Sequence, residues 1–96
     1  MKTDAVKKTS QKLKTIHAEN KFSAYSNHTG IMSTNYDFKM IFGSIESVTD
    51  SEITVLELGS VTLSPQHAKA FCKNFSQSIE KYEAAFGEIK LVGNPT

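Results

Sequence analysis

Arginine and tryptophan are absent from this 96-residue sequence, cysteine occurs once, and proline occurs twice. Because lysine offers only a point charge, the lack of arginine disfavours planar, bidentate recognition of carboxylates, phosphates or bases. The single cysteine, Cys72, has no partner for an intramolecular disulfide. No stretch approaches the roughly 20 apolar residues of a membrane-spanning helix, and no apolar segment follows the lysine-rich start as in a secretory signal. We therefore expect one cytoplasmic domain with no membrane partner.

Charge is divided unevenly along the chain. Residues 1–21 carry six lysines and two acids, a net charge of +4, whereas residues 22–96 carry five lysines and eight acids, a net charge of −3. Apolar residues are sparse in the first segment and its helix propensity is low, so we expect a flexible basic arm at 1–21. Such an arm could contact nucleic acid through charge alone, and a solvated arm that binds nothing is the simpler alternative.

Three segments have the residue pattern of β-strands: 22–32, 36–45 and 52–63. In the second, every other residue is a large apolar one, which is the period of a strand with one covered face. Those residues are Tyr36, Phe38, Met40 and Phe42. Gly43 breaks the alternation in the second segment and Gly59 breaks it in the third, which predicts a bulge or kink at each.

A long helix is predicted over residues 65–86. Ser64 is a preferred N-cap, and proline is favoured at the first helical position, which Pro65 would occupy. Apolar side chains recur at helical spacing and predict one apolar stripe. They are Ala68, Phe71, Cys72, Phe75, Ile79, Tyr82 and Phe86. Gly87 then provides a natural C-terminal cap.

The order of these elements predicts an α+β fold, an antiparallel β-meander (β-β-β) followed by one long C-terminal amphipathic helix laid across one sheet face. We expect a flexible arm at 1–21, a single domain at 22–89 and a short tail at 90–96. Apolar residues occur on both faces of the strands, and one helix cannot cover both. A second copy of the chain is the simplest cover, so we expect a homo-oligomer, with a dimer favoured.

Catalytic and metal-binding patterns are lacking. His17, His28 and His67 have no metal-ligand spacing with one another or with Cys72. His67 and Cys72 are five residues apart on the predicted helix, so their side chains diverge, and Cys72 lies on the apolar stripe. We expect no enzymatic activity, no catalytic residue, no metal and no cofactor.

One candidate anion site lies at the predicted helix start. Free backbone N–H groups there attract anions, and basic side chains would reinforce them. The candidate residues are Ser64, Gln66, His67 and Lys69. Basic residues come first on this helix and acids last, against the preference of the helix dipole. Exposed charges that cost only a few tenths of a kcal/mol each are the simpler explanation of this order.

A candidate interaction face is formed by apolar and amide side chains of the first two strand segments. Its residues are Tyr25, Asn27, Phe38, Met40 and Phe42. Exposed aromatic side chains on a sheet can bind extended apolar segments, and an open sheet edge can accept an added strand. A protein or peptide partner is therefore possible in addition to a second copy.

Several short motifs resemble those of a family of small prokaryotic proteins classed as a domain of unknown function. The resemblance covers about residues 22–89. The motifs are Tyr25-Ser26-Asn27, Tyr36-Asp37-Phe38 with Phe42-Gly43, Ser64-Pro65-Gln66-His67-Ala68-Lys69, Tyr82-Glu83 and Phe86-Gly87. At Ile41 this chain departs from the family, which often has an acid there. The resemblance implies a compact strand-rich domain with a C-terminal helix and implies no activity.

These observations favour a small non-enzymatic protein that acts as a homo-oligomeric protein-interaction module. The strands-then-helix order is also similar to a shortened SecB export-chaperone topology, so a chaperone-like or peptide-binding surface is one alternative. Electrostatic nucleic-acid binding through the basic arm is another.

Overall fold

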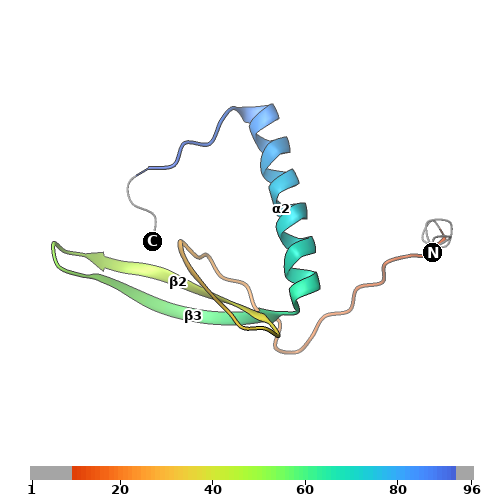
Figure 1. Ribbon diagram of the computed structural model, residues 1–96, viewed down its shortest axis with the longest axis horizontal. Coiled ribbons are helices and arrows are strands. Elements are labelled where there is room, and N and C mark those ends of the chain that lie inside the picture. The colour runs from red at the N-terminus through yellow and green to blue at the C-terminus, as the bar shows by residue number, and fades with distance from the viewer. Residues whose placement is uncertain (1–9, 93–96) are drawn as a thin grey trace.

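The computed structural model describes residues 10–92, which form a three-stranded antiparallel sheet followed by one helix (Figure 1). The strands are β1 (His28–Ser33), β2 (Phe38–Val48) and β3 (Ile53–Leu63), and the helix is α2 (Pro65–Phe86). The sheet order β1-β2-β3 follows the chain, so the predicted meander and the α+β class are confirmed. Parts of the predicted arm and tail, residues 1–9 and 93–96, lie outside the described residues.

The first strand begins later than predicted, at His28 instead of residue 22. Just before it, Asn27 bonds to β2 through both its backbone and its side chain. Asn27 donates its backbone N–H to the Gly43 carbonyl at 3.1 Å, and its Oδ1 accepts the Ile45 N–H at 2.9 Å. The Asn27 side chain thus satisfies a backbone donor of β2 that a longer first strand would have paired through its own backbone, and the regular ladder begins at His28.

The predicted irregularity in the sheet lies where the two glycines meet. Phe42 pairs with Gly59 and Gly43 pairs with Glu57, so Leu58 has no partner in the β2–β3 register. This extra residue is a β-bulge, as both glycines indicated. A second register shift follows between Ile45 and Ser47.

Two threonine turns connect the strands. Thr34 Oγ1 accepts the backbone N–H groups of Tyr36 and Asp37 between β1 and β2. Thr49 Oγ1 accepts the N–H groups of Ser51 and Glu52 between β2 and β3 in the same way. The hydroxyls thus satisfy backbone donors that the reversal of the chain leaves without ladder partners.

Both predicted ends of the helix are confirmed. Ser64 has extended backbone geometry, and its Oγ accepts the His67 N–H at 3.1 Å, as expected of an N-cap. Gly87 ends the helix with a φ of 103°, which a residue with a Cβ rarely adopts, and donates its N–H to the Glu83 carbonyl at 2.8 Å.

The position of α2 corrects one prediction. The helix does not lie across its own sheet; it leaves the end of β3 and projects away from the strands (Figure 1). Within residues 10–92 no hydrophobic side chain is buried, and the radius of gyration is 17.8 Å. A compact chain of this length would have about 13 Å. The apolar stripe and the sheet face that it was expected to cover are therefore both left open in one protomer.

Candidate functional site

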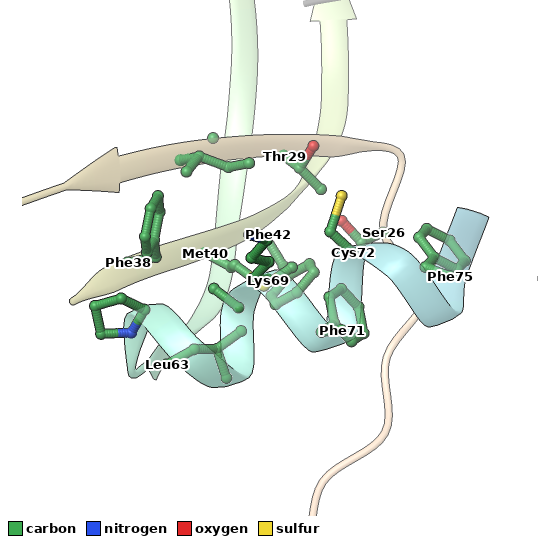
Figure 2. A pocket seen from close by; sticks show the side chains of 14 residues that line it. Ser26, Thr29, Phe38, Met40, Phe42, Leu63, Lys69, Phe71, Cys72 and Phe75 are labelled. Atoms are coloured by element: carbon green, nitrogen blue, oxygen red, sulfur yellow. The ribbon is translucent and has the colours of Figure 1, made fainter. Parts of the chain in front are cut away.

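An apolar groove lies between the first half of α2 and one face of the sheet (Figure 2). Its volume is about 970 Å³, at the upper end of the range for ligand-binding pockets. β2 forms one wall with Phe38, Met40 and Phe42, and α2 forms the other. The α2 wall consists of Pro65, Ala68, Lys69, Phe71, Cys72 and Phe75.

Strand geometry brings the sheet wall together. Side chains at alternate positions of a strand share a face, so the three large residues of β2 point into the groove. The register sets Ile31 of β1 opposite Met40 and Thr29 opposite Phe42, and both residues extend the same wall. Leu63 of β3, the partner of Phe38, closes the end nearest the helix start.

The helix wall consists of rings that stack along α2. Phe71 and Phe75 are one turn apart, with ring centroids at 5.7 Å and an interplanar angle of 24°. Tyr82 and Phe86 form a second pair beyond the groove, with centroids at 5.0 Å. Such pairs stabilise the helix locally, but all four rings remain largely exposed to solvent.

Lys69 is the one charged side chain among the described residues that line the groove. Its ammonium has no acidic partner within residues 10–92. The groove therefore suits an apolar occupant that carries a carboxylate near the start of α2.

The structure divides the predicted interaction face. Phe38, Met40 and Phe42 lie together in the groove. Tyr25 is exposed and does not line it, and Asn27 is engaged in holding the backbone of Ile45. The sequence offered no reason to separate these five residues, because only the register shows which of them face α2.

The residues of the candidate anion site are also separated. The Ser64 hydroxyl is occupied as the helix cap, and Lys69 faces the groove. Gln66 and His67 are exposed and do not line the groove. The four residues therefore form no shared pocket in the described part of the chain.

A second, smaller hollow of about 540 Å³ lies between residues 22–26 and the sheet. Phe22 and Ala24 approach Leu58 and Val61 there. Ser26 borders both this hollow and the main groove, and its Oγ lies 2.8 Å from the Gly43 carbonyl and 3.2 Å from the Gly43 nitrogen. These two contacts, here called the Ser26 clamp, were not predicted, although a serine directly before a strand was their signal.

Groups suited to metal binding or nucleophilic chemistry are not gathered in the described residues. Within residues 10–92 no set of three His, Cys, Asp or Glu side chains is placed to hold a metal ion. Cys72 is a free thiol in the helix wall of the groove, and His67 lies outside that wall. Across the same residues, no helix has both the length and the apolar character needed to span a bilayer.

The fold and the groove define a class of protein. It is a small α+β protein in which an open apolar groove lies between a three-stranded meander and a projecting C-terminal helix. The chain belongs to the family described as "Protein of unknown function (DUF3467)", whose model matches residues 1–91. The match extends the predicted resemblance, which began at residue 22, to include the basic arm. No curated protein and no solved structure matches the sequence significantly.

Proposed function

We propose that this chain is the protomer of a homo-oligomeric protein-interaction module that has no catalytic activity. One observation supports the proposal most strongly: within residues 10–92 no hydrophobic side chain is buried, although 39% of the chain is hydrophobic. A second copy of the chain can cover this open apolar surface, and it is always present at the same concentration as the first.

Conformational entropy makes a lone, open protomer unfavourable. Ordering each residue costs about 1–2 kcal/mol, and burial of apolar surface is the main term that offsets this cost. Hydrogen bonds in a three-stranded sheet contribute only about 1 kcal/mol each after exchange with water. A protomer without a buried core therefore gains its stability from surface that becomes buried in an assembly.

The exposed aromatic rings on α2 supply more than half of the area that a stable dimer interface needs. Phe71, Phe75, Tyr82 and Phe86 are 41%, 56%, 52% and 75% exposed. With about 200 Å² for a whole aromatic side chain, the four rings leave roughly 450 Å² open on one helix. A stable interface takes about 800 Å² from each partner, so the rings alone provide more than half of it.

Peptide binding is a second candidate function, favoured by the sheet wall of the groove. Phe38, Met40 and Phe42 form a continuous apolar row of a kind that binds side chains of an extended segment. In this case the protein would be a folded monomer with its groove open, and a peptide would supply the missing apolar cover.

Sedimentation velocity on the full chain over a wide dilution series separates the two candidates. We expect a species whose mass is a multiple of the 10.6 kDa protomer, with dissociation and loss of cooperative unfolding at the lowest concentrations. A folded monomer at every concentration would overturn the proposal and leave the peptide-binding alternative. Binding of a labelled DNA or RNA oligonucleotide at low salt, lost on deletion of residues 1–21, would instead support nucleic-acid binding.

A further inference from the structure

Six of the seven residues in the apolar stripe on α2 form a regular series, and the seventh, Phe71, lies on its flank. Without Phe71, the intervals from Ala68 to Phe86 are four, three, four, three and four residues. Continuous alternation of three and four is the seam of a helix that packs along another helix. The seam residues are Ala68, Cys72, Phe75, Ile79, Tyr82 and Phe86.

The two halves of this seam have different surroundings. Ala68, Cys72 and Phe75 line the groove. The opposite wall of the groove is the sheet of the same chain (Figure 2). Ile79 and Tyr82 do not line the groove. They belong to the second half of α2, which extends away from the sheet (Figure 1). The first half of α2 thus forms one wall of the groove, and the sheet forms the other. The second half carries apolar side chains that could fill such a groove in another copy.

We infer that α2 of a second copy enters the groove antiparallel to α2 of the first, so that the second half of each helix fills the groove of the other chain. The inference rests on the proposed function, because it specifies how the homo-oligomer is built. A two-fold axis near residue 77 relates the copies, and each groove and each projecting half is used once.

Side-chain sizes complement one another in this register. The antiparallel seam places Ala68 against Phe86 of the second copy, Cys72 against Tyr82, and Phe75 against Ile79. Each of the two smallest seam residues therefore meets an aromatic residue. Interiors pack at uniform density, so a small residue opposite a large one avoids both a void and a clash.

The residues that flank the seam also match. Phe71 lies on one flank and would meet Ala85 of the second copy, again a large residue against a small one. On the other flank Lys69 would meet Glu83 of the second copy, and the pair occurs twice in the dimer. Glu83 uses Oε2 to accept the Ile89 N–H at 3.0 Å, which leaves its other oxygen for the lysine.

A parallel pair would lack these matches. It would set Cys72 against Cys72 and Ala68 against Ala68 at one end, and Phe86 against Phe86 at the other. Small residues would then leave voids at the start of the pair, and large rings would crowd at its end. Lys69 and Glu83 would lie four turns apart and could not pair.

Cysteine cross-linking of the full chain tests the orientation. Tyr82→Cys brings a second thiol opposite Cys72 of the other copy, so mild oxidation should give a covalent dimer on a non-reducing gel. Wild-type protein, with Cys72 alone, and Cys72→Ser/Tyr82→Cys are matched single-cysteine controls. In the antiparallel pair their identical thiols are about 15 Å apart, beyond the roughly 7 Å Cα separation that a disulfide spans, so neither should cross-link.

Charge reversal tests the same register without altering the seam. Lys69→Glu should weaken dimerisation about tenfold, which corresponds to about 1.4 kcal/mol shared by two symmetry-related pairs. Lys69→Glu/Glu83→Lys should restore the wild-type dissociation constant. Lys73→Glu makes the same change in charge one turn further on, outside the groove, and should leave dimerisation unchanged.

The outcomes separate the inference from the proposed function. An oligomer in which the single-cysteine controls cross-link, or in which Lys73→Glu weakens association as much as Lys69→Glu, would overturn the antiparallel pair and leave the homo-oligomer. An oligomer in which no variant cross-links and the double charge reversal fails to rescue would do the same. A monomer under all conditions would overturn both.

Discussion

Gly43 is the most closely packed of the described glycines, and replacing it with alanine should destabilise the protein. A Cβ at this residue would lie 2.5 Å from Val55 Cγ1 and 3.1 Å from the Leu56 carbonyl oxygen. Gly43 is also the one described residue that the fold buries. Since valine is stiff at χ1 and a paired strand carbonyl cannot move far, the methyl group has no free space.

Gly59 provides a matched control at the same bulge. Its added Cβ would meet nothing within 4 Å, and neither glycine has a positive φ. Alanine at Gly59 should therefore stabilise the protein by about 0.4–1 kcal/mol, because it restricts the unfolded chain. At Gly43 the same gain is outweighed by overpacking, which costs about 1–3 kcal/mol. We expect the two variants to differ by about 2 kcal/mol.

Thermal unfolding followed by circular dichroism measures this difference. For a domain of this size about 2 kcal/mol corresponds to a difference in Tm on the order of 10 °C, with Gly43→Ala the lower. All samples need the same protein concentration, because association shifts Tm. Adding Val55→Ala should recover part of the loss in a double-mutant cycle. If Gly43→Ala were as stable as Gly59→Ala, the close approach at the bulge would be refuted.

Three further predictions address the clamp, the helix cap and the assembly. Ser26→Ala removes the hydroxyl that contacts both backbone groups of Gly43, and it should lower the free energy of unfolding in urea by about 1–3 kcal/mol. The control Ser23→Ala changes an exposed serine and should have little effect. Equal losses from the two variants would contradict the clamp. Ser64→Ala should lower the free energy of unfolding by about 1 kcal/mol and Ser64→Asp should leave it almost unchanged, because only alanine lacks an acceptor for the His67 N–H. If both variants lowered the urea midpoint equally, the capping role of Ser64 would be contradicted. Dilution should lower the wild-type Tm steadily, because unfolding is linked to dissociation, and a Tm independent of concentration would contradict this.

Much of the fold followed from the sequence because its signals were local. Pro65 and Gly87 mark the ends of α2, and the glycines at 43 and 59 mark the bulge. Alternation in β2 identified Phe38, Met40 and Phe42 as one face, and the structure places all three in the groove. Each of these features depends on residues within a few positions of one another, which periodicity and capping preferences describe well.

Two features were not local and were predicted wrongly or missed. The helix was expected to cover its own sheet, but the direction in which a chain leaves Leu63 and Ser64 depends on backbone angles at a single junction, which no periodic pattern encodes. Ser26 acts on Gly43, 17 residues later, and only the register brings the two together. An apolar stripe indicates that a face is covered but gives no information about which chain covers it.

The order of charges on α2 gains a physical reason from the proposed pair. The first turn has no acid and the last turn no base, so α2 lacks the charges that would stabilise its dipole. Glu83 in the last turn is unfavourable for an isolated helix by about 0.3–1 kcal/mol. In an antiparallel pair the basic start of one helix lies beside the acidic end of the other, and the opposed helix dipoles attract as well. A parallel pair would instead bring the two basic starts together at one end and the two acidic ends together at the other, with parallel helix dipoles that repel. The arrangement that weakens α2 alone therefore favours one orientation of the assembly over the other, and the double charge reversal of Lys69 and Glu83 separates that explanation from charges that merely face solvent.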